Sequence, residues 1–238
     1  MSDHILKKQK FIFICLCVYS SVSLAQDNYV TLGTGAGFSQ SLADVTNKIN
    51  FQRVYHAHLD YHITKFITAG AEFDLGRIRN GSAEIVPNDN PNYSRFFVND
   101  FKAVNINTKI ALGQLINDES GLIKGTYIGT GMTVLFNNQI LIRRTYTFSD
   151  GSTYSLSGKD KETILAFPIT AGFNFLLPFE QENFSIGVDG QINIVPGDHL
   201  DGYSENIYHK RPDFLALGFI SIRYNFLNRP YSMRNPKF

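Results

Sequence analysis

The sequence predicts an all-β protein, a transmembrane up-and-down antiparallel β-barrel of about eight strands preceded by a cleaved signal peptide. Three observations lead to this prediction. Several segments alternate strictly between apolar and polar residues, which is the period of a strand with two unlike faces. No apolar run beyond the N-terminus is long enough for a spanning helix. The connections between the predicted strands alternate between long and short, which is typical of membrane-spanning barrels.

The clearest alternating segment is 184–195, FSIGVDGQINIV. At about 3.3 Å per residue, a tilted strand of this length reaches across the hydrocarbon core of a bilayer. The other parity is polar or glycine from Ser185 to Asn193. The apolar parity is predicted to face lipid, and it consists of Phe184, Ile186, Val188, Ile192 and Ile194.

The N-terminus has the features of a secretory signal. Lys7, Lys8 and Lys10 precede a short apolar run that ends in the small-x-small pattern Ser23-Leu24-Ala25. We therefore predict a signal peptide at 1–25, a barrel at 26–226 and a short periplasmic tail at 227–238. A retained membrane helix is the alternative, and it is disfavoured because a span needs roughly 20 apolar residues.

The mature chain is predicted to contain no cysteine and almost no net charge. Cys15 and Cys17 both lie inside the signal, which excludes disulfides and thiolate sites from the mature chain. Removing residues 1–25 takes away three lysines and one aspartate, and no basic stripe remains that would indicate a nucleic-acid partner.

The first three strands are predicted at 29–38, 51–61 and 66–76. The polar parity of the first contains Gly33, Gly35 and Gly37, which suggests a crowded interior. A phosphate-binding loop is the alternative for this GTGAG run, but neither a following helix nor a neighbouring lysine supports it. The polar parities of the second and third strands carry His56, His58, Asp60, Glu72 and Asp74.

The middle strands follow a long loop predicted at 77–95. The fourth strand is predicted to end near Leu115, with Lys109 on its polar parity, and a modest turn with Asn117, Asp118 and Gly121 follows. The fifth strand is predicted at 126–136. The connection 137–161 contains Asp150-Gly151 between two Tyr/Thr/Ser-rich runs, which predicts a hairpin that continues both neighbouring strands.

The last three strands are predicted at 164–175, 184–195 and 213–226. Pro168 cannot donate to a sheet ladder, so we expect a bulge there. The final strand has an unclear polar parity, because Leu215, Leu217 and Phe219 precede the polar residues. A bulge and an apolar interior plug both explain this pattern, and the sequence leaves the choice open.

Alternation alone does not decide which face points inward. A soluble lipocalin-like barrel buries its apolar face, whereas a membrane barrel turns it to lipid. Aromatic residues on the apolar parity favour lipid, because they gather at strand ends as interfacial girdles do. They are Phe38, Phe51, Tyr61, Phe136, Phe175, Phe184, Tyr224 and Phe226.

The final segment GFISIRYNF resembles the closing strand of outer-membrane β-barrels, and together with GTYIGTGMTV at 125–134 it is similar to the small eight-stranded barrels of the OmpA/OmpX-like class. The resemblance implies outer-membrane lipids as surroundings, the outer membrane of a Gram-negative cell as location, and recognition of Tyr224 and Phe226 by the barrel assembly machinery. Barrels of this class usually end on the aromatic residue, whereas here 227–238 follows. That tail is too short for a peptidoglycan-binding domain.

The charged residues on the polar parity are predicted to form an ion network in the lumen, because unpaired charges there would be costly. The network comprises Glu72, Asp74, Lys109, Asp189, Arg223, His56 and His58, with Lys109 pairing with Glu72 or Asp74 and Arg223 with Asp189. A metal site at His56, His58 and Asp60 is the alternative. We predict no cofactor, no metal and no catalytic residue, since nothing fixes a triad geometry for Asp198, His199, Ser204 and His209.

The predicted function is that of a non-enzymatic outer-membrane barrel protein with long outer loops for surface interaction, 137–161 among them, or a role in envelope integrity. A small pore is the alternative. Eight strands leave an interior just filled by side chains, which argues against a pore, while the inward glycines argue for one. A soluble periplasmic lipid carrier and a barrel enzyme are disfavoured.

Overall fold

The structure is a computed structural model of the 238-residue chain, and it describes residues 29–42, 50–81, 96–115, 125–148, 150–155, 157–176, 183–197, 200–202 and 212–226. Several predictions concern residues outside this part. They are the signal peptide at 1–25, the tail at 227–238, the turn residues Asn117, Asp118 and Gly121, and the loop residues Asp198, His199, Ser204 and His209.

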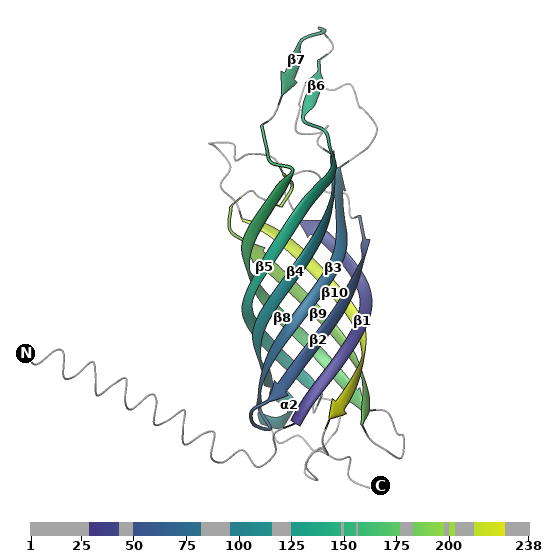
Figure 1. The fold of residues 1–238 in the computed structure, drawn as a ribbon, viewed down its shortest axis with the longest axis vertical. Helices are drawn as coiled ribbons and strands as arrows, with labels where there is room; N and C mark the ends of the chain where they lie inside the picture. The colour runs from purple at the N-terminus through teal and green to yellow at the C-terminus, as the bar shows by residue number, and fades with distance from the viewer. Residues whose placement is uncertain are drawn as a thin grey trace, which may run out of the picture.

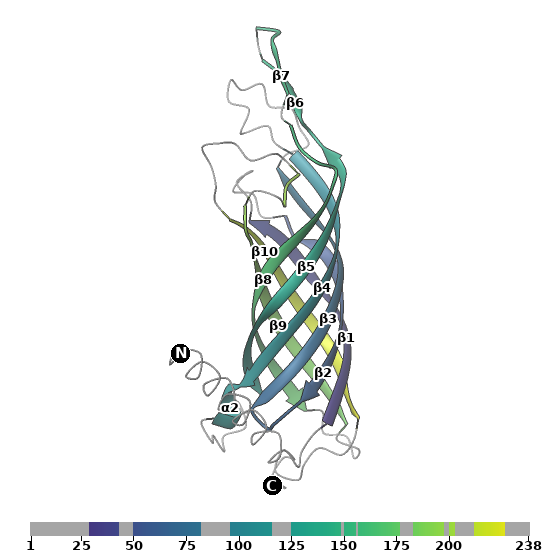
Figure 2. The ribbon, with the colours of Figure 1, turned by 60° about the vertical axis from the view of Figure 1, so that its left-hand side comes forward.

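Eight strands of the described chain close into an antiparallel barrel (Figures 1 and 2). Their order around the barrel is β1-β10-β9-β8-β5-β4-β3-β2, so each strand pairs with its sequence neighbours and β1 closes the barrel against β10. This confirms the predicted eight-stranded up-and-down topology. The bounds are Tyr29–Leu42 (β1), Gln52–His62 (β2), Ile67–Gly81 (β3), Phe96–Ala111 (β4), Thr126–Ile142 (β5), Lys161–Leu176 (β8), Phe184–Val195 (β9) and Asp213–Phe226 (β10).

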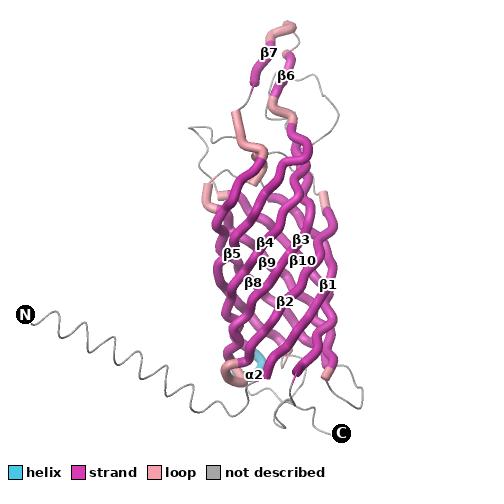
Figure 3. The backbone as a smooth tube through the Cα atoms, in the orientation of Figure 1, coloured by secondary structure: helices cyan, strands magenta, loops and turns pink. Residues whose placement is uncertain are grey.

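A small hairpin stands beyond one end of the barrel (Figure 3). Strands β6 (Thr145–Thr147) and β7 (Thr153–Ser155) pair antiparallel, which confirms the hairpin predicted from Asp150-Gly151. The opposite end carries α2 (Leu112–Leu115), the first residues of β1 and the last residues of β10 (Figure 1). Among the described residues, no helix is long and apolar enough to cross a membrane.

Several strands reach further toward the hairpin end than predicted. Residues 77–81, expected in a loop, continue β3 and pair with the start of β4. Likewise, 137–142 continues β5. The sequence pattern did not predict these extensions because the polarity of the inner and outer faces differs there from the rest of the strand. Ile78 is buried, whereas Arg77 on the opposite parity is exposed, so this part lacks the apolar outer parity by which the strands were recognised.

The fourth strand ends earlier than predicted, at Ala111 and not near Leu115. Its partner β3 begins at Ile67, which pairs with Ile110, so no ladder is left to extend β4. The chain forms the single turn of α2 instead. The connection 112–125 therefore spans as many residues as 82–95, and the alternation of long and short connections is weaker than predicted.

The bulge predicted at Pro168 is wrong. The register of β8 is constant against both neighbours, and the pairing with β5 is merely interrupted opposite Gly131 and Met132. The carbonyl of Pro168 accepts a hydrogen bond from Thr130 Oγ1 at 2.9 Å, so the proline is accommodated without an inserted residue. A register shift does occur between Val98 and Asn99, where β4 meets β5.

The interior contains an apolar layer near the hairpin end. Leu215, Leu217 and Phe219 are all buried in it, and the register of β10 is constant against both neighbours. An apolar plug, and not a bulge, therefore accounts for the unclear parity of the last strand. The other members of this layer are Val54, Ile78, Phe97, Phe101, Ala103, Leu135, Ile164, Ala166, Val195 and Leu200.

Candidate functional site

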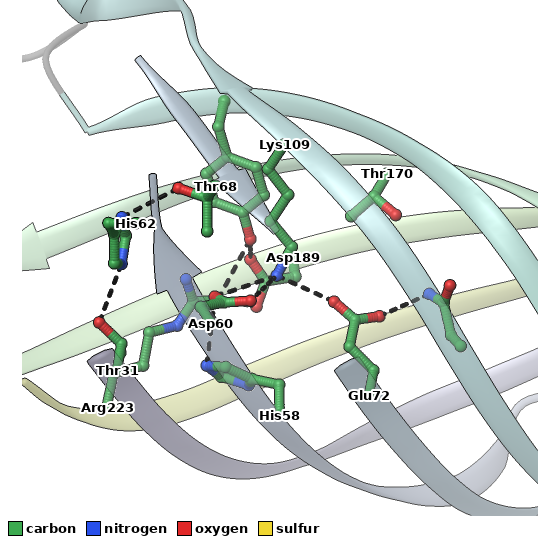
Figure 4. A network of polar contacts seen from close by, with 12 residues as sticks. Thr31, His58, Asp60, His62, Thr68, Glu72, Lys109, Thr170, Asp189 and Arg223 are labelled. Carbon is green, nitrogen blue, oxygen red and sulfur yellow. Dashed lines mark hydrogen bonds and ion pairs between the residues drawn. The ribbon is translucent and has the colours of Figure 1, made fainter. Parts of the chain in front are cut away.

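Lys109 of β4 lies at the centre of an ion cluster inside the barrel. Its Nζ is 2.9 Å from Oδ1 of Asp60 on β2 and 2.9 Å from Oε1 of Glu72 on β3 (Figure 4). The second oxygen of Glu72 accepts a hydrogen bond from Asn105 Nδ2 at 2.8 Å. All four side chains are buried, so the ammonium group is surrounded by partners that replace its hydration.

Arg223 of β10 forms a second cluster, which adjoins the first. Its guanidinium group contacts the carboxylate of Asp189 and donates to Asn174 Oδ1, and Tyr127 also donates to Asp189. Both cations lie near the Tyr127 ring, whose centroid is 5.6 Å from Lys109 Nζ and 5.7 Å from Arg223 Cζ. The two clusters therefore form one polar layer around Tyr127.

Two histidines of β2 extend this polar layer toward Asp74. A hydrogen bond of 2.6 Å joins His56 Nδ1 to Asp74 Oδ1, and one of 3.0 Å joins His56 Nε2 to His58 Nδ1. Both ring nitrogens of His56 are therefore occupied by protein partners. The described residues contain no group of three or more His, Cys, Asp or Glu side chains arranged to hold a metal ion.

The seven side chains predicted for the lumen network are all buried in the barrel: Glu72, Asp74, Lys109, Asp189, Arg223, His56 and His58. Lys109 contacts Glu72 and not Asp74, whose carboxylate is bonded to His56. Sequence reasoning missed Asp60 and Tyr127 as members. The strand register identifies Asp60 as inward-facing and crowded, because Asp60 lies opposite Gly70. A Cβ atom at Gly70 would collide with the Asp60 carboxylate.

Two of the inward glycines, Gly33 and Gly187, make room for these large side chains. A Cβ atom at Gly187 would lie 2.3 Å from Arg223 Nε, and one at Gly33 would lie 2.2 Å from His58 Cε1. The space that these glycines leave is therefore occupied, and the glycines do not indicate an open channel.

The outer surface of the barrel is apolar over its middle part. Val188 and Ile192 of β9 are each 46% exposed, and Phe184 is 39% exposed, while Ile186 and Ile194 on the same parity are half-buried. The other strands continue this surface around the barrel. Large apolar side chains that are at least half exposed include Ile106, Met132, Ile169, Ile220 and Ile222. We call this surface the apolar belt.

The hairpin beyond the barrel is held together by its turn. Phe148 N donates to Ser152 O at 2.8 Å, and Gly151 adopts φ +82°, which favours glycine. Asp150 Oδ1 accepts two hydrogen bonds from Ser152, one from the hydroxyl at 2.6 Å and one from the backbone N–H at 2.8 Å. These bonds hold the pKa of the Asp150 carboxyl below its ordinary value.

Fold and interior together define a closed eight-stranded antiparallel β-barrel with an apolar outer belt, an ion-paired polar layer inside and an apolar layer above it. No protein-family model matches the sequence, and no curated protein matches it.

Solved structures with some similarity include three barrels. The chain is 10% identical to Ail, the attachment invasion locus protein of Yersinia pestis, solved with the heparin analogue sucrose octasulfate; the TM-score is 0.46, over 84% of this chain and 100% of Ail. Neisserial surface protein A is 8% identical, with a TM-score of 0.46 over 84% of this chain and 97% of the other. The N-terminal barrel domain of Pseudomonas aeruginosa OprF is 13% identical, with a TM-score of 0.41 over 84% and 98%. With TM-scores below 0.5, none of these similarities bears on what this chain does.

Proposed function

We propose that this chain is a non-enzymatic integral protein of the outer membrane of a Gram-negative cell. The apolar belt is the observation that carries this proposal. A soluble carrier barrel buries its apolar face around a ligand, whereas here the buried face is polar and charged in one layer and the outer face is apolar. So large an exposed apolar surface on a water-soluble monomer would be an aggregation hazard, and in a bilayer it is solvated by lipid.

The barrel stands in the membrane with its hairpin end outward. That end carries the β6–β7 hairpin, and the opposite end carries the first residues of β1 and the last of β10, consistent with a chain exported and inserted from the periplasm (Figure 1). Tyr224 and Phe226, which stack edge-on with centroids 4.9 Å apart, are the residues that assembly machinery would recognise in the last strand.

The lumen does not conduct. In the polar layer, Lys109 and Arg223 are held by buried carboxylates, and the space beside Gly33 and Gly187 is occupied by the side chains of His58 and Arg223. Above it, the apolar layer places Phe97, Phe101 and Leu215 in positions with at most 2% exposure. An ion would have to pass both layers and lose its hydration in the second. These packing features disfavour the small-pore alternative.

The β6–β7 hairpin is the surface on which a partner would bind. Each of its strands has one neighbour only within the described residues, so the outer edges present backbone N–H and C=O groups to an extended segment. Interaction at this end, and not chemistry inside the barrel, is the task that the architecture supports.

A labelling experiment tests the membrane assignment. Fluorophores are attached to Val188→Cys, in the apolar belt, and to Thr153→Cys, which is exposed on the hairpin. In native outer membranes, a lipid-soluble quencher should reach the label at 188 and a water-soluble quencher should reach the label at 153. Ready quenching at 188 by the water-soluble reagent would refute the assignment, because a soluble barrel leaves that position in water.

A further inference from the structure

Four cationic side chains gather on the outer surface above the apolar belt. Arg53 of β2, Arg77 of β3, Lys102 of β4 and Lys161 of β8 are all exposed, and together they line a groove of about 1120 Å³. Their strand neighbours Val54 and Ala103 are buried inside, which places the four cations on the outside of the wall. We call this feature the basic groove.

The register places the basic groove at the upper edge of the apolar belt. Lys102 pairs with Leu75 on β3 and with Phe136 on β5, and both apolar side chains line the same groove as the cations. Tyr55, opposite Leu75 on β2, lines it as well. Lys102 therefore lies in the same row as the apolar residues of the groove, which is continuous with the belt. Arg77 and Lys161 lie one row nearer the hairpin end, with Asp100 and Asn138 between them.

The groove carries an excess of positive charge. Two carboxylates line it beside the four cations. Asp100 is bound by Arg77 through hydrogen bonds of 2.6 and 3.2 Å, and Glu162 is bound by Lys159 at 3.0 Å. Within the part of the chain that the structure describes, no carboxylate contacts Arg53, Lys102 or Lys161. Three cations thus face the groove without an anionic partner, beside an apolar floor.

We propose that the basic groove binds the phosphorylated head group of a lipid in the leaflet at the hairpin end, with the acyl chains on Leu75 and Phe136. Guanidinium and ammonium groups are the usual protein ligands of phosphate, and basic sites at the membrane surface recognise phosphorylated head groups. The continuous apolar floor favours a lipid over a free phosphate, because a soluble anion would make no use of it. This assignment rests on the proposed membrane location.

The test uses the full chain, folded in zwitterionic micelles, and a glycolipid that carries two phosphates on an acylated disaccharide. Native mass spectrometry measures how much glycolipid stays bound. We expect the protein to bind this glycolipid about tenfold more tightly than the same lipid after removal of its phosphates. The variant with Arg53→Gln, Lys102→Gln and Lys161→Gln should lose that preference. Lys65→Gln is the matched control, since Lys65 is exposed at the opposite end, over the ring of Phe66.

Three results would overturn the proposal: equal binding of both glycolipids, an unchanged preference in the triple variant, or displacement by millimolar inorganic phosphate, which would identify a soluble-anion site. If the triple variant does not fold, the single variants Lys102→Gln and Lys161→Gln take its place. The labelled Val188→Cys chain tests the membrane location separately from the lipid-binding assignment of the groove. Protection at 188 without head-group preference rejects only the groove assignment, whereas exposure at 188 rejects the membrane location.

Discussion

The imidazole of His56 stacks on the ring of Phe219, with centroids 4.3 Å apart and an interplanar angle of 26°. On one side of this pair lie the hydrogen bonds of His56 to Asp74 and His58, and on the other side lies the apolar layer to which Phe219 belongs. The contact marks the boundary between the two halves of the interior. The polar layer and the apolar layer of the interior are therefore in direct contact through these two rings.

Removal of the Lys109 charge should strongly destabilise the barrel. Lys109→Met keeps the bulk of the side chain but leaves the carboxylates of Asp60 and Glu72 buried without a cation. We expect the free energy of unfolding to fall by about 3–5 kcal/mol. Urea titration in lipid vesicles measures it.

Two comparison variants sharpen this prediction. Lys65→Met, at an exposed position, should change stability by less than about 0.5 kcal/mol. Adding Asp60→Asn and Glu72→Gln to Lys109→Met should restore part of the loss. A Lys109→Met protein as stable as the unchanged one would show that the cluster contributes nothing.

The apolar layer should keep the lumen closed even when the polar layer is disrupted. In planar bilayers we expect no unitary conductance from the unchanged protein, nor from Arg223→Gln, because Phe97, Phe101 and Leu215 remain in place. Conductance should appear only when Phe101→Ser and Leu215→Ser are added to Arg223→Gln. Steps of conductance in the unchanged protein would contradict the closed lumen.

Gly37 should tolerate no side chain. A Cβ atom there would lie 1.7 Å from the carbonyl oxygen of Gly218 on the adjacent strand, so Gly37→Ala forces the two backbones apart. We expect a loss of about 1–3 kcal/mol in the free energy of unfolding. Gly190→Ala is the control, since its Cβ would meet only Ala171 O at 3.9 Å. Equal effects of the two substitutions would refute the steric argument.

Proteases added to intact cells should cut in the β6–β7 hairpin first. Its described residues are largely exposed, and the barrel ladders do not depend on it. The cut protein should therefore keep its folded mobility in unheated gels. Cleavage in 112–125 should require permeabilised cells. The reverse order would invert the proposed orientation of the barrel.

The turn at Asp150 should titrate at low pH. The folded turn lowers the pKa of this carboxyl, so the stability it contributes is complete above the ordinary carboxyl pKa and is lost as the pH falls through the lowered value. Ser152→Ala removes the hydroxyl donor and should move the Asp150 pKa upward, whereas Thr153→Ala should leave it in place. Carbon NMR titration of the carboxyl group decides between these outcomes.

The alternation of apolar and polar residues was sufficient to predict the bounds of strands that carry one apolar and one polar face. The bounds of β9 and β10 agree with the prediction for this reason. It failed to predict the strand at 77–81, where the outer face carries Arg77 and Arg79 and the inner face carries Ile78 and Asn80. The interior network was predicted only as a set of inward residues. Which of them meet depends on the stagger between strands, so Asp60 and Tyr127 could be recognised as partners only from the register.

The pairing of Val30 with Phe226 brings together residues from the beginning and the end of the barrel sequence. Until β10 is in place, β1 and β9 each present an open edge, and unpaired backbone groups in lipid cost several kcal/mol apiece. In the proposed bilayer, a barrel of seven strands would therefore be left with two costly open edges. In the proposed membrane location, stable insertion would require β10 to pair with both β1 and β9, and a chain that ends before β10 should not insert stably.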